Sequence, residues 1–220
     1  MIEVLYEDNH LIAVNKKSGE LVQADKTKDD PISNKIKAYI KKKYNKPGEV
    51  FLGTIHRLDR PTSGVVLFAK NSKSLSRMNN QFKNKEVKKI YWAIIEKKPN
   101  KESGYLENYL VKNQKLNKSY ITTIKQGKFA SLYYKVIKKL NNYTLLEINP
   151  NTGRHHQIRV QLSNIGCCIK GDLKYGAKRS NKDSSINLLA KKLEFIHPVS
   201  KELIKIVAPT PKDIIWKHCN

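Results

Sequence analysis

The chain has 220 residues, 39% of them hydrophobic, and a net charge of +24. This length and hydrophobic content suit one large globular domain and exclude a disordered tail. No apolar run reaches the roughly 20 residues of a membrane helix, and the first residues lack the basic and apolar regions of a signal peptide. We therefore expect a cytoplasmic protein that does not enter a membrane.

The pattern along the chain mixes strands and helices. Apolar or alternating runs predict strands at 2–6, 11–15, 65–69, 87–95, 120–124, 132–137, 144–148, 192–196 and 203–207. Four helices are expected. The first starts at Asp30, and the second follows Asn71, which can act as its N-cap. The third contains the apolar stripe Ile158, Leu162 and Ile165, and the fourth starts at a capping box at 210–213. Strands outnumber helices and do not alternate regularly with them, which predicts an α+β fold with a mixed, largely antiparallel sheet.

The three cysteines argue against a disulfide framework, because their number is odd and Cys167 and Cys168 are adjacent. This usage fits a reducing compartment. A zinc site formed with the nearby pair His155-His156 is the alternative. Neither pair has the C-x-x-C or H-x-x-x-H spacing that zinc sites use, so we expect no metal.

The positive charge indicates a polyanionic partner, although lysine can also accumulate on solvated faces through composition alone. Only six of the 43 basic residues are arginines, and four of them fall in two short segments. These four are Arg57, Arg60, Arg154 and Arg159. Arginine offers a fixed fork of donors and a permanent charge, so these two segments are more informative than the lysine count.

The first segment, 55–64, places one carboxylate, Asp59, between two guanidinium groups and before a proline turn. A surface loop held by an Asp–Arg ion pair is one interpretation. The other is a nucleophilic carboxylate, because neighbouring cations keep such a group ionised and oriented.

The second segment, Thr-Gly-Arg-His-His-Gln-Ile-Arg at 152–159, follows a strand and runs into a helix. By itself it fits either a phosphate-binding helix start or a second surface pair.

Together with later segments, these residues resemble a known family. His-Arg-Leu-Asp-Arg-Pro-Thr-Ser-Gly followed by Val-Val-Leu-Phe-Ala-Lys at 56–70 closely resembles the catalytic motif of RluA-type pseudouridine synthases, which modify ribosomal RNA and tRNA. Further resemblances follow in the same order at 89–93, 152–159, 171–176, and 188–190 with 195–198. The likeness covers about residues 2–208.

The resemblance implies a single pseudouridine-synthase-type catalytic domain over residues 1–220, with a central RNA-binding cleft. It resembles the short form of the family, without the amino-terminal S4 domain that many relatives carry. Leu189 stands where the family usually has histidine, so a polar role at that position is in doubt.

The resemblance also implies roles for five residues. Asp59 is the expected catalytic aspartate, which either attacks the sugar or promotes elimination, and Arg159 is expected to pair with it. Tyr91 would lie against the uracil ring, Arg57 would fill the space left by the flipped uridine, and Leu188 would form an apolar wall. Because isomerisation transfers no electron or group, we expect no cofactor.

Arg60 and Arg154 are expected to contact RNA. The resemblance gives architectural roles to Gly171, Asp172, Tyr175 and His197. We expect a monomer that isomerises specific uridines in structured RNA, with ribosomal RNA favoured and tRNA left open. One alternative is a non-catalytic RNA-binding protein on the same scaffold. Another is a hydrolase that uses Asp59 as base, which the lack of a second carboxylate or metal cluster disfavours.

Overall fold

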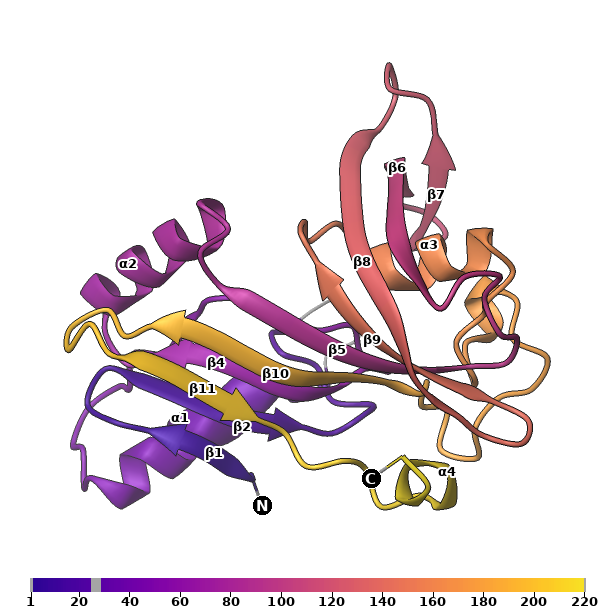
Figure 1. Cartoon of the computed structure of the whole chain (residues 1–220). Helices are drawn as coiled ribbons and strands as arrows, with labels where there is room; N and C mark the ends of the chain where they lie inside the picture. Colours follow the sequence, from indigo (N-terminus) through magenta and orange to yellow (C-terminus); the bar gives the residue numbers. More distant parts are fainter. Residues whose placement is uncertain (1, 25–28, 220) are drawn as a thin grey trace. The chain divides into compact units, whose positions relative to one another are not determined.

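The computed structural model describes residues 2–24 and 29–219. The chain forms two compact units, and Figure 1 traces both in sequence colours. Unit 1 comprises Met1–Lys88 and Ala190–Pro209, and unit 2 comprises Lys89–Leu189 and Thr210–Asn220. The chain thus passes from the first unit to the second and back before its last helix.

Unit 1 is a small antiparallel sheet with two helices. Its elements are β1 (Val4–Glu7), β2 (Leu11–Lys16), α1 (Ile32–Lys43), β3 (Gly53–Thr54), β4 (Ser63–Ala69), α2 (Ser72–Lys83), most of β10 (Leu188–Ile196), and β11 (Leu203–Val207). Within this unit the strand order is β1-β2-β4-β10, and two further strands lie off this path, β11 paired with β10 and β3 paired with β4. The pairs β1–β2, β2–β4, β3–β4 and β10–β11 are all antiparallel.

Helix α1 covers part of this sheet through a stripe of isoleucines. Ile32, Ile36 and Ile40 recur at helical spacing, are buried, and share one core cluster with Ile12 of β2 and Phe68 of β4. Burial of each such side chain contributes about 1.5–3 kcal/mol, so the stripe fixes the helix on the sheet.

Gly64 permits a close approach between β4 and β10. Its φ is +115°, a conformation that side-chain-bearing residues rarely adopt, and a Cβ atom there would lie 2.7 Å from the backbone nitrogen of Ala190. The glycine in the 56–64 motif is therefore required by packing within unit 1.

Unit 2 is built on five antiparallel strands in the order β5-β9-β8-β6-β7. Its elements are β5 (Lys88–Ile95), β6 (Ser103–Asn113), β7 (Lys118–Thr122), β8 (Lys128–Lys139), β9 (Thr144–Pro150), α3 (Gln157–Asn164), the short 3₁₀ helix η1 (Leu173–Tyr175), and α4 (Ile214–Lys217). The α+β fold with a largely antiparallel sheet is thus confirmed.

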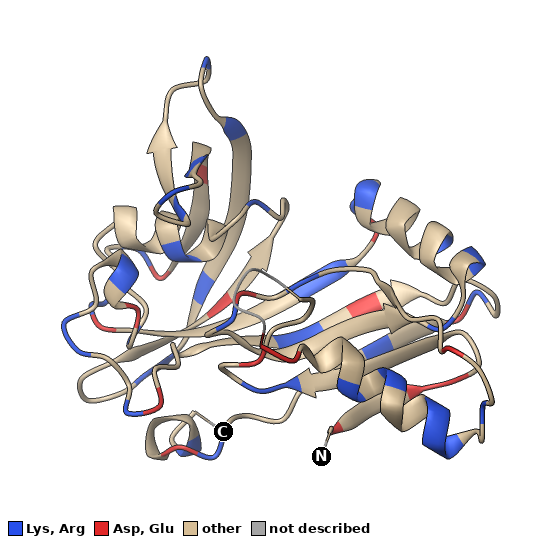
Figure 2. Ribbon diagram, turned by 180° about the vertical axis from the view of Figure 1, so that it is seen from behind, with Lys and Arg blue, Asp and Glu red and all other residues tan. Residues whose placement is uncertain are grey.

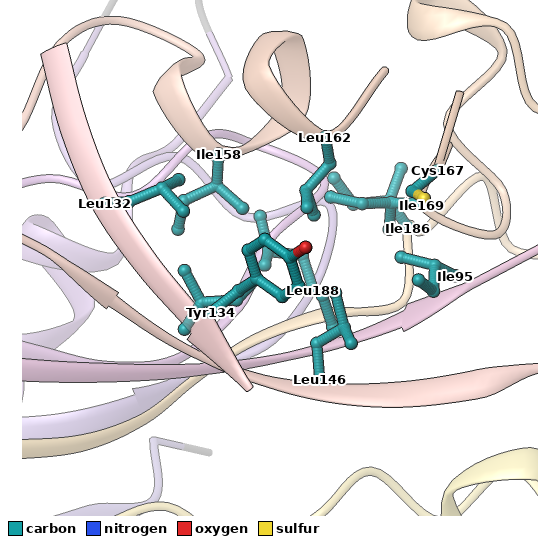
Figure 3. Close-up of a cluster of buried hydrophobic side chains, with 12 residues drawn as sticks. Ile95, Leu132, Tyr134, Leu146, Ile158, Leu162, Cys167, Ile169, Ile186 and Leu188 are labelled. Atoms are coloured by element: carbon teal, nitrogen blue, oxygen red, sulfur yellow. The ribbon is translucent and has the colours of Figure 1, made fainter. Parts of the chain in front are cut away.

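The core of unit 2 lies between α3 and the sheet. Ile158 and Leu162 of α3 pack with Leu132 and Tyr134 of β8 and Leu146 of β9, as Figure 3 shows. The α3 sequence buries nearly every residue from its first turn onward, including the polar Gln157 and Arg159. A polar residue in such a place needs specific partners, and these partners form part of the candidate site.

Several predicted elements need correction. Helix α1 begins at Ile32, two residues after the predicted start at Asp30, because Pro31 is its N-cap residue. Ile165 lies outside the α3 stripe, as the helix ends at Asn164 and Ile165 is 37% exposed. The long strand β6 was missed.

The cap of the last helix was also placed wrongly. The side chain of Asp213 accepts hydrogen bonds from the N–H groups of Ile215 and Trp216, at 2.9 and 3.0 Å, so Asp213 and not Thr210 caps α4. None of the helices formed by residues 2–24 and 29–219 is long and apolar enough to cross a membrane.

Candidate active site

The segment that contains Asp59 is a loop of unit 1 between β3 and β4. The N–H of Thr62 donates to the carbonyl oxygen of Asp59 at 3.0 Å, which closes a turn just before β4. The Asp59 side chain is half-buried, while Arg57 and Arg60 are exposed. The loop therefore carries three of the predicted site residues on one short stretch of backbone.

A buried lysine holds the backbone of this loop. Lys16, the last residue of β2, has no exposed surface, and its Nζ donates to the carbonyl oxygens of Thr62 at 2.7 Å and of Arg60 and Lys17 at 3.0 Å. The ammonium group has three hydrogens, so these three carbonyls satisfy it completely. Lys16 thereby ties the end of β2 to the loop that carries Asp59.

Two neighbours of Lys16 complete this attachment. The Ser18 hydroxyl donates to the carbonyl oxygen of Pro61 at 3.0 Å, and the Gly19 N–H donates to that of Arg60 at 2.9 Å. The segment 16–19 thus binds the carbonyl groups of residues 60, 61 and 62. Sequence reasoning missed this segment, and the Ser18-Gly19 turn after a buried strand is the one local signal that marks it.

Burial lowers the pKa of Lys16 to about 8, against the opposing attraction of the Glu20 and Asp59 carboxylates. Desolvation wins because the direct partners of the ammonium are neutral carbonyls, which stabilise a charge less than a carboxylate does. The negative charge of Asp59 is therefore felt at the lysine that positions its loop.

Arg60 is engaged within unit 1. Its Nε donates to the carbonyl oxygen of Gly19 at 3.1 Å, and its Nη2 lies 2.8 Å from a carboxylate oxygen of Asp29. Both members of this ion pair are about half exposed, so the pair contributes little to stability. Contact of Arg60 with RNA stays a prediction.

In unit 2, the predicted Arg159 lies on α3 and makes a bidentate ion pair. Its Nε donates to Oδ2 of Asp172 at 2.7 Å, and its Nη2 donates to Oδ1 at 2.8 Å. The two residues are 4% and 1% exposed. Asp172, expected to be architectural, is thus the residue that orients Arg159, and it uses two of the five guanidinium N–H bonds. The expected pairing of Arg159 with Asp59 stays a prediction.

The ring of Tyr175 adds a second restraint on Arg159. The guanidinium carbon lies 5.0 Å from the ring centre, within the range of a cation–π contact. The Tyr175 hydroxyl accepts a hydrogen bond from the N–H of Ser119 at 2.8 Å and bonds Nδ1 of His156 at 2.9 Å. The ring is therefore fixed from β7 and from the residue that precedes α3.

His156 is buried and carries a strongly depressed pKa. Burial, followed by the nearby charge of Arg159, lowers the pKa of His156 to about 2. Its imidazole is consequently neutral at physiological pH. Its φ of +53° makes it the turn between the loop and α3, and its ring stacks on that of His155 with 3.8 Å between centroids.

The start of α3 also positions Arg154. Gln157 Oε1 accepts hydrogen bonds from the Arg154 N–H at 2.9 Å and from the Thr152 hydroxyl at 2.7 Å. The exposed Arg154 side chain donates from Nε to the carbonyl oxygen of Phe129 at 2.9 Å. Contact of Arg154 with RNA stays a prediction.

Leu188 and Tyr91 both contribute to the core of unit 2. Leu188 is 4% exposed and belongs to the cluster that also contains Ile158 (Figure 3). The half-buried Tyr91 packs against this cluster. The expected role of Leu188 as an apolar wall of the substrate pocket stays a prediction. Leu189, where the family usually has histidine, is fully buried. An aliphatic side chain suits this position.

The basic residues are spread over helices and strands of both units, as Figure 2 shows. Among residues 2–24 and 29–219, no three His, Cys, Asp or Glu side chains form a group that could hold a metal ion. Cys167 is part of the unit 2 core, where burial raises the pKa of its thiol.

Comparisons with known proteins agree on one family. The chain matches the family model described as RNA pseudouridylate synthase over residues 10–164. It is 35% identical to a protein of Buchnera aphidicola subsp. Schizaphis graminum named ribosomal large subunit pseudouridine synthase C, over 98% of this chain and 68% of that protein. It is 31% identical to the Bacillus subtilis protein named uncharacterized RNA pseudouridine synthase YlyB, over 97% of this chain and 70% of that protein.

A solved structure shares the fold. Human RNA Pseudouridylate Synthase Domain Containing 4 matches with a TM-score of 0.81 at 23% identity, over 97% of this chain and 90% of that one.

Proposed function

The chain belongs to the RNA pseudouridylate synthase family, and from this premise we propose that it isomerises specific uridines of a structured RNA with Asp59 as the catalytic aspartate. It is a pseudouridine synthase, an isomerase that acts on RNA. The family match does not favour the alternative of a non-catalytic RNA-binding protein.

The main structural support for Asp59 as the catalytic aspartate is that the backbone of its loop is held in place by hydrogen bonds. Residues 16–19 bind the carbonyl groups of residues 60–62, and Lys16 does so from a fully buried position. A loop whose backbone is fixed in this way keeps a half-buried carboxylate in one orientation. Such preorganisation is what nucleophilic or general-base chemistry at a sugar requires.

The remaining roles follow the same proposal. Arg159 orients the carboxylate through its planar donors, and Tyr91 offers an aromatic face to the detached uracil, which must turn before it rejoins through C5. Leu188 supplies an apolar wall, and Arg57 fills the stack from which the uridine is flipped. The bidentate Arg159–Asp172 pair supports this, because it holds the guanidinium in place within unit 2.

Ribosomal RNA is the substrate that we favour, because the curated relative in Buchnera is named as a synthase of the large ribosomal subunit. Transfer RNA is the competing substrate. Primer extension after carbodiimide treatment, with RNA from cells with and without the gene, distinguishes the two. The proposal also includes three further points. The protein acts as a monomer in the cytoplasm, its catalytic domain spans residues 1–220, and it needs no cofactor.

Replacement of Asp59 by asparagine tests the catalytic assignment. We expect Asp59→Asn, nearly isosteric but uncharged, to abolish pseudouridine formation while the protein still folds and binds RNA. Release of tritium from RNA labelled at C5 of uridine measures the reaction. Asp30→Asn is the matched control, since Asp30 is an exposed carboxylate of unit 1 outside the loop. Activity of Asp59→Asn within about tenfold of wild type would overturn the assignment.

A further inference from the structure

Strands β6, β7 and β8 of unit 2 carry five aromatic side chains on one face. Antiparallel register places Tyr105 opposite Tyr133, and Tyr109 opposite Phe129. Tyr120 lies opposite Val111, which has the same parity along β6 as Tyr105 and Tyr109. Because side chains alternate across a strand, all five point to the same side of the sheet. We call this surface the aromatic face: Tyr105, Tyr109, Tyr120, Phe129 and Tyr133.

The opposite face of these strands packs against α3. Leu110 and Ala130 share a buried cluster with Val160 of α3 and with Tyr175. Gln161 of α3 donates to the carbonyl oxygen of Leu106 at 2.9 Å. The core of unit 2 therefore uses one face of the strands and does not account for the aromatic residues on the other.

The aromatic face is open to solvent. Tyr105 is 67% exposed, Phe129 is 41% exposed and Tyr120 is 39% exposed. The rings are ordered against one another, with centroids 5.1 Å apart in the Tyr105–Tyr133 pair and 5.7 Å apart in the Tyr109–Phe129 pair. Large exposed rings in an ordered row indicate a binding surface.

Charge identifies the kind of partner. Register places Lys135 of β8 and Lys118 of β7 on the aromatic face, opposite Ser103 and Asn113, and a single acidic residue, Glu107, lies there opposite Ser131. Lys118 Nζ lies 5.4 Å from the ring centre of Tyr120. Surfaces that bind another protein are depleted in lysine, whereas surfaces that bind single-stranded nucleic acid combine lysine with aromatic rings.

We propose that the aromatic face binds unpaired bases of the RNA substrate by stacking, as a second RNA contact outside the catalytic residues. The inference rests on the proposed function only for the identity of the partner. Stacking is tolerant of sequence, because every base has an aromatic face. The surface would thus add affinity for a single-stranded segment that flanks the modified stem-loop.

The test is a binding titration of Tyr105→Ala/Phe129→Ala with a fluorescent oligouridine of about 20 nucleotides. We expect its Kd to rise at least about tenfold, because the variant loses the two exposed rings on which bases would stack. Phe51→Ala is the matched control, because Phe51 is an exposed aromatic residue of unit 1 that lies outside this face. Tyr105→Phe/Phe129→Tyr keeps both rings and should retain wild-type affinity.

Three results would overturn the inference. One is an unchanged Kd in the folded double variant. Another is the absence of cross-links from a 4-thiouridine oligonucleotide to peptides of β6 and β8. A third is a wild-type dimer in light scattering that the double variant converts to monomer, since the face would then be a subunit interface. Failure of the proposed function is seen separately, as a lack of tritium release by the wild-type protein, and leaves the oligouridine result intact.

Discussion

Lys16 in unit 1 and Arg159 in unit 2 are both buried cations, but the protein holds them in opposite ways. Lys16 donates from one nitrogen to three backbone carbonyls, whereas Arg159 donates from two nitrogens to the single carboxylate of Asp172. The charge of Arg159 is compensated by a full opposite charge in direct contact. The charge of Lys16 is compensated only by neutral dipoles, and its pKa falls to about 8.

The two cations therefore contribute to the candidate active site in different ways. Lys16 organises other residues, because its partners are the backbone of the loop that carries Asp59. Arg159 is itself organised, because Asp172 and the ring of Tyr175 fix the position of its guanidinium. We therefore expect replacement of Arg159 to remove a group that acts on the substrate site, and replacement of Lys16 to loosen a group that remains present.

The largest effect after that of Asp59 is expected for Arg159→Lys. Lysine keeps the charge but cannot form two parallel bonds to Asp172, so kcat should fall about 100-fold or more. Single-turnover tritium release at saturating enzyme measures this loss, and a thermal melt reports whether the protein is folded.

Arg154→Lys is the matched control for this change. The exposed Arg154 side chain donates to a backbone carbonyl, an interaction that lysine can replace, and the expected loss is within about threefold. An equal loss of kcat in Arg159→Lys and Arg154→Lys would contradict this prediction, because the bidentate pair with Asp172 would then not explain the need for arginine at position 159.

A smaller effect is expected for Lys16→Met, which fills the same space without the ammonium. Two opposing changes act on stability, since the desolvation cost of a buried charge disappears while three carbonyls lose their donor. We expect the melting temperature to move little and kcat to fall about tenfold, because the loop loses its anchor.

Lys17→Met controls for the loss of one positive charge beside the same loop, as Lys17 is exposed. It should leave kcat unchanged. If Lys16→Met lowered the melting temperature and the folded fraction but left the rate per folded molecule intact, Lys16 would support the fold and not the loop.

The sequence predicted the elements whose signals are local. Asn71 does cap α2, accepting a hydrogen bond from the N–H of Ser74 at 2.8 Å, and the last strand was placed at Leu203–Val207 as observed. Strand β6 was missed because both of its faces carry large side chains. Leu106 and Leu110 point to α3 while Tyr105 and Tyr109 point to solvent, so the apolar alternation disappears.

The partners of the two buried cations could not be predicted from local signals. Lys16 binds residues that are 44 and 46 positions away, and the register of β2 on β4 decides that Lys16 rather than Lys17 is buried. The resemblance to the family identified Arg159 and Asp172 but gave no reason to pair them. The pairing arises because η1 and α3 pack together in unit 2.

The smallest expected effect is a pH dependence of stability that comes from Lys16. Its folded pKa of about 8 lies below the ordinary value of 10.5, so between these values the unfolded chain binds more protons than the folded one. Stability from this group must then rise as the pH increases through 8, by about 1 kcal/mol between pH 7 and pH 9. The measurements must stay below pH 10, because burial raises the pKa of Tyr6 to about 12 and the folded state loses stability once unfolded tyrosine ionises.

Urea unfolding at a series of pH values, for wild type and Lys16→Met, isolates the contribution of Lys16 to the free energy of unfolding. A wild-type stability that does not rise relative to Lys16→Met between pH 7 and pH 9 would show that the three carbonyls compensate the buried charge as fully as a carboxylate does for Arg159.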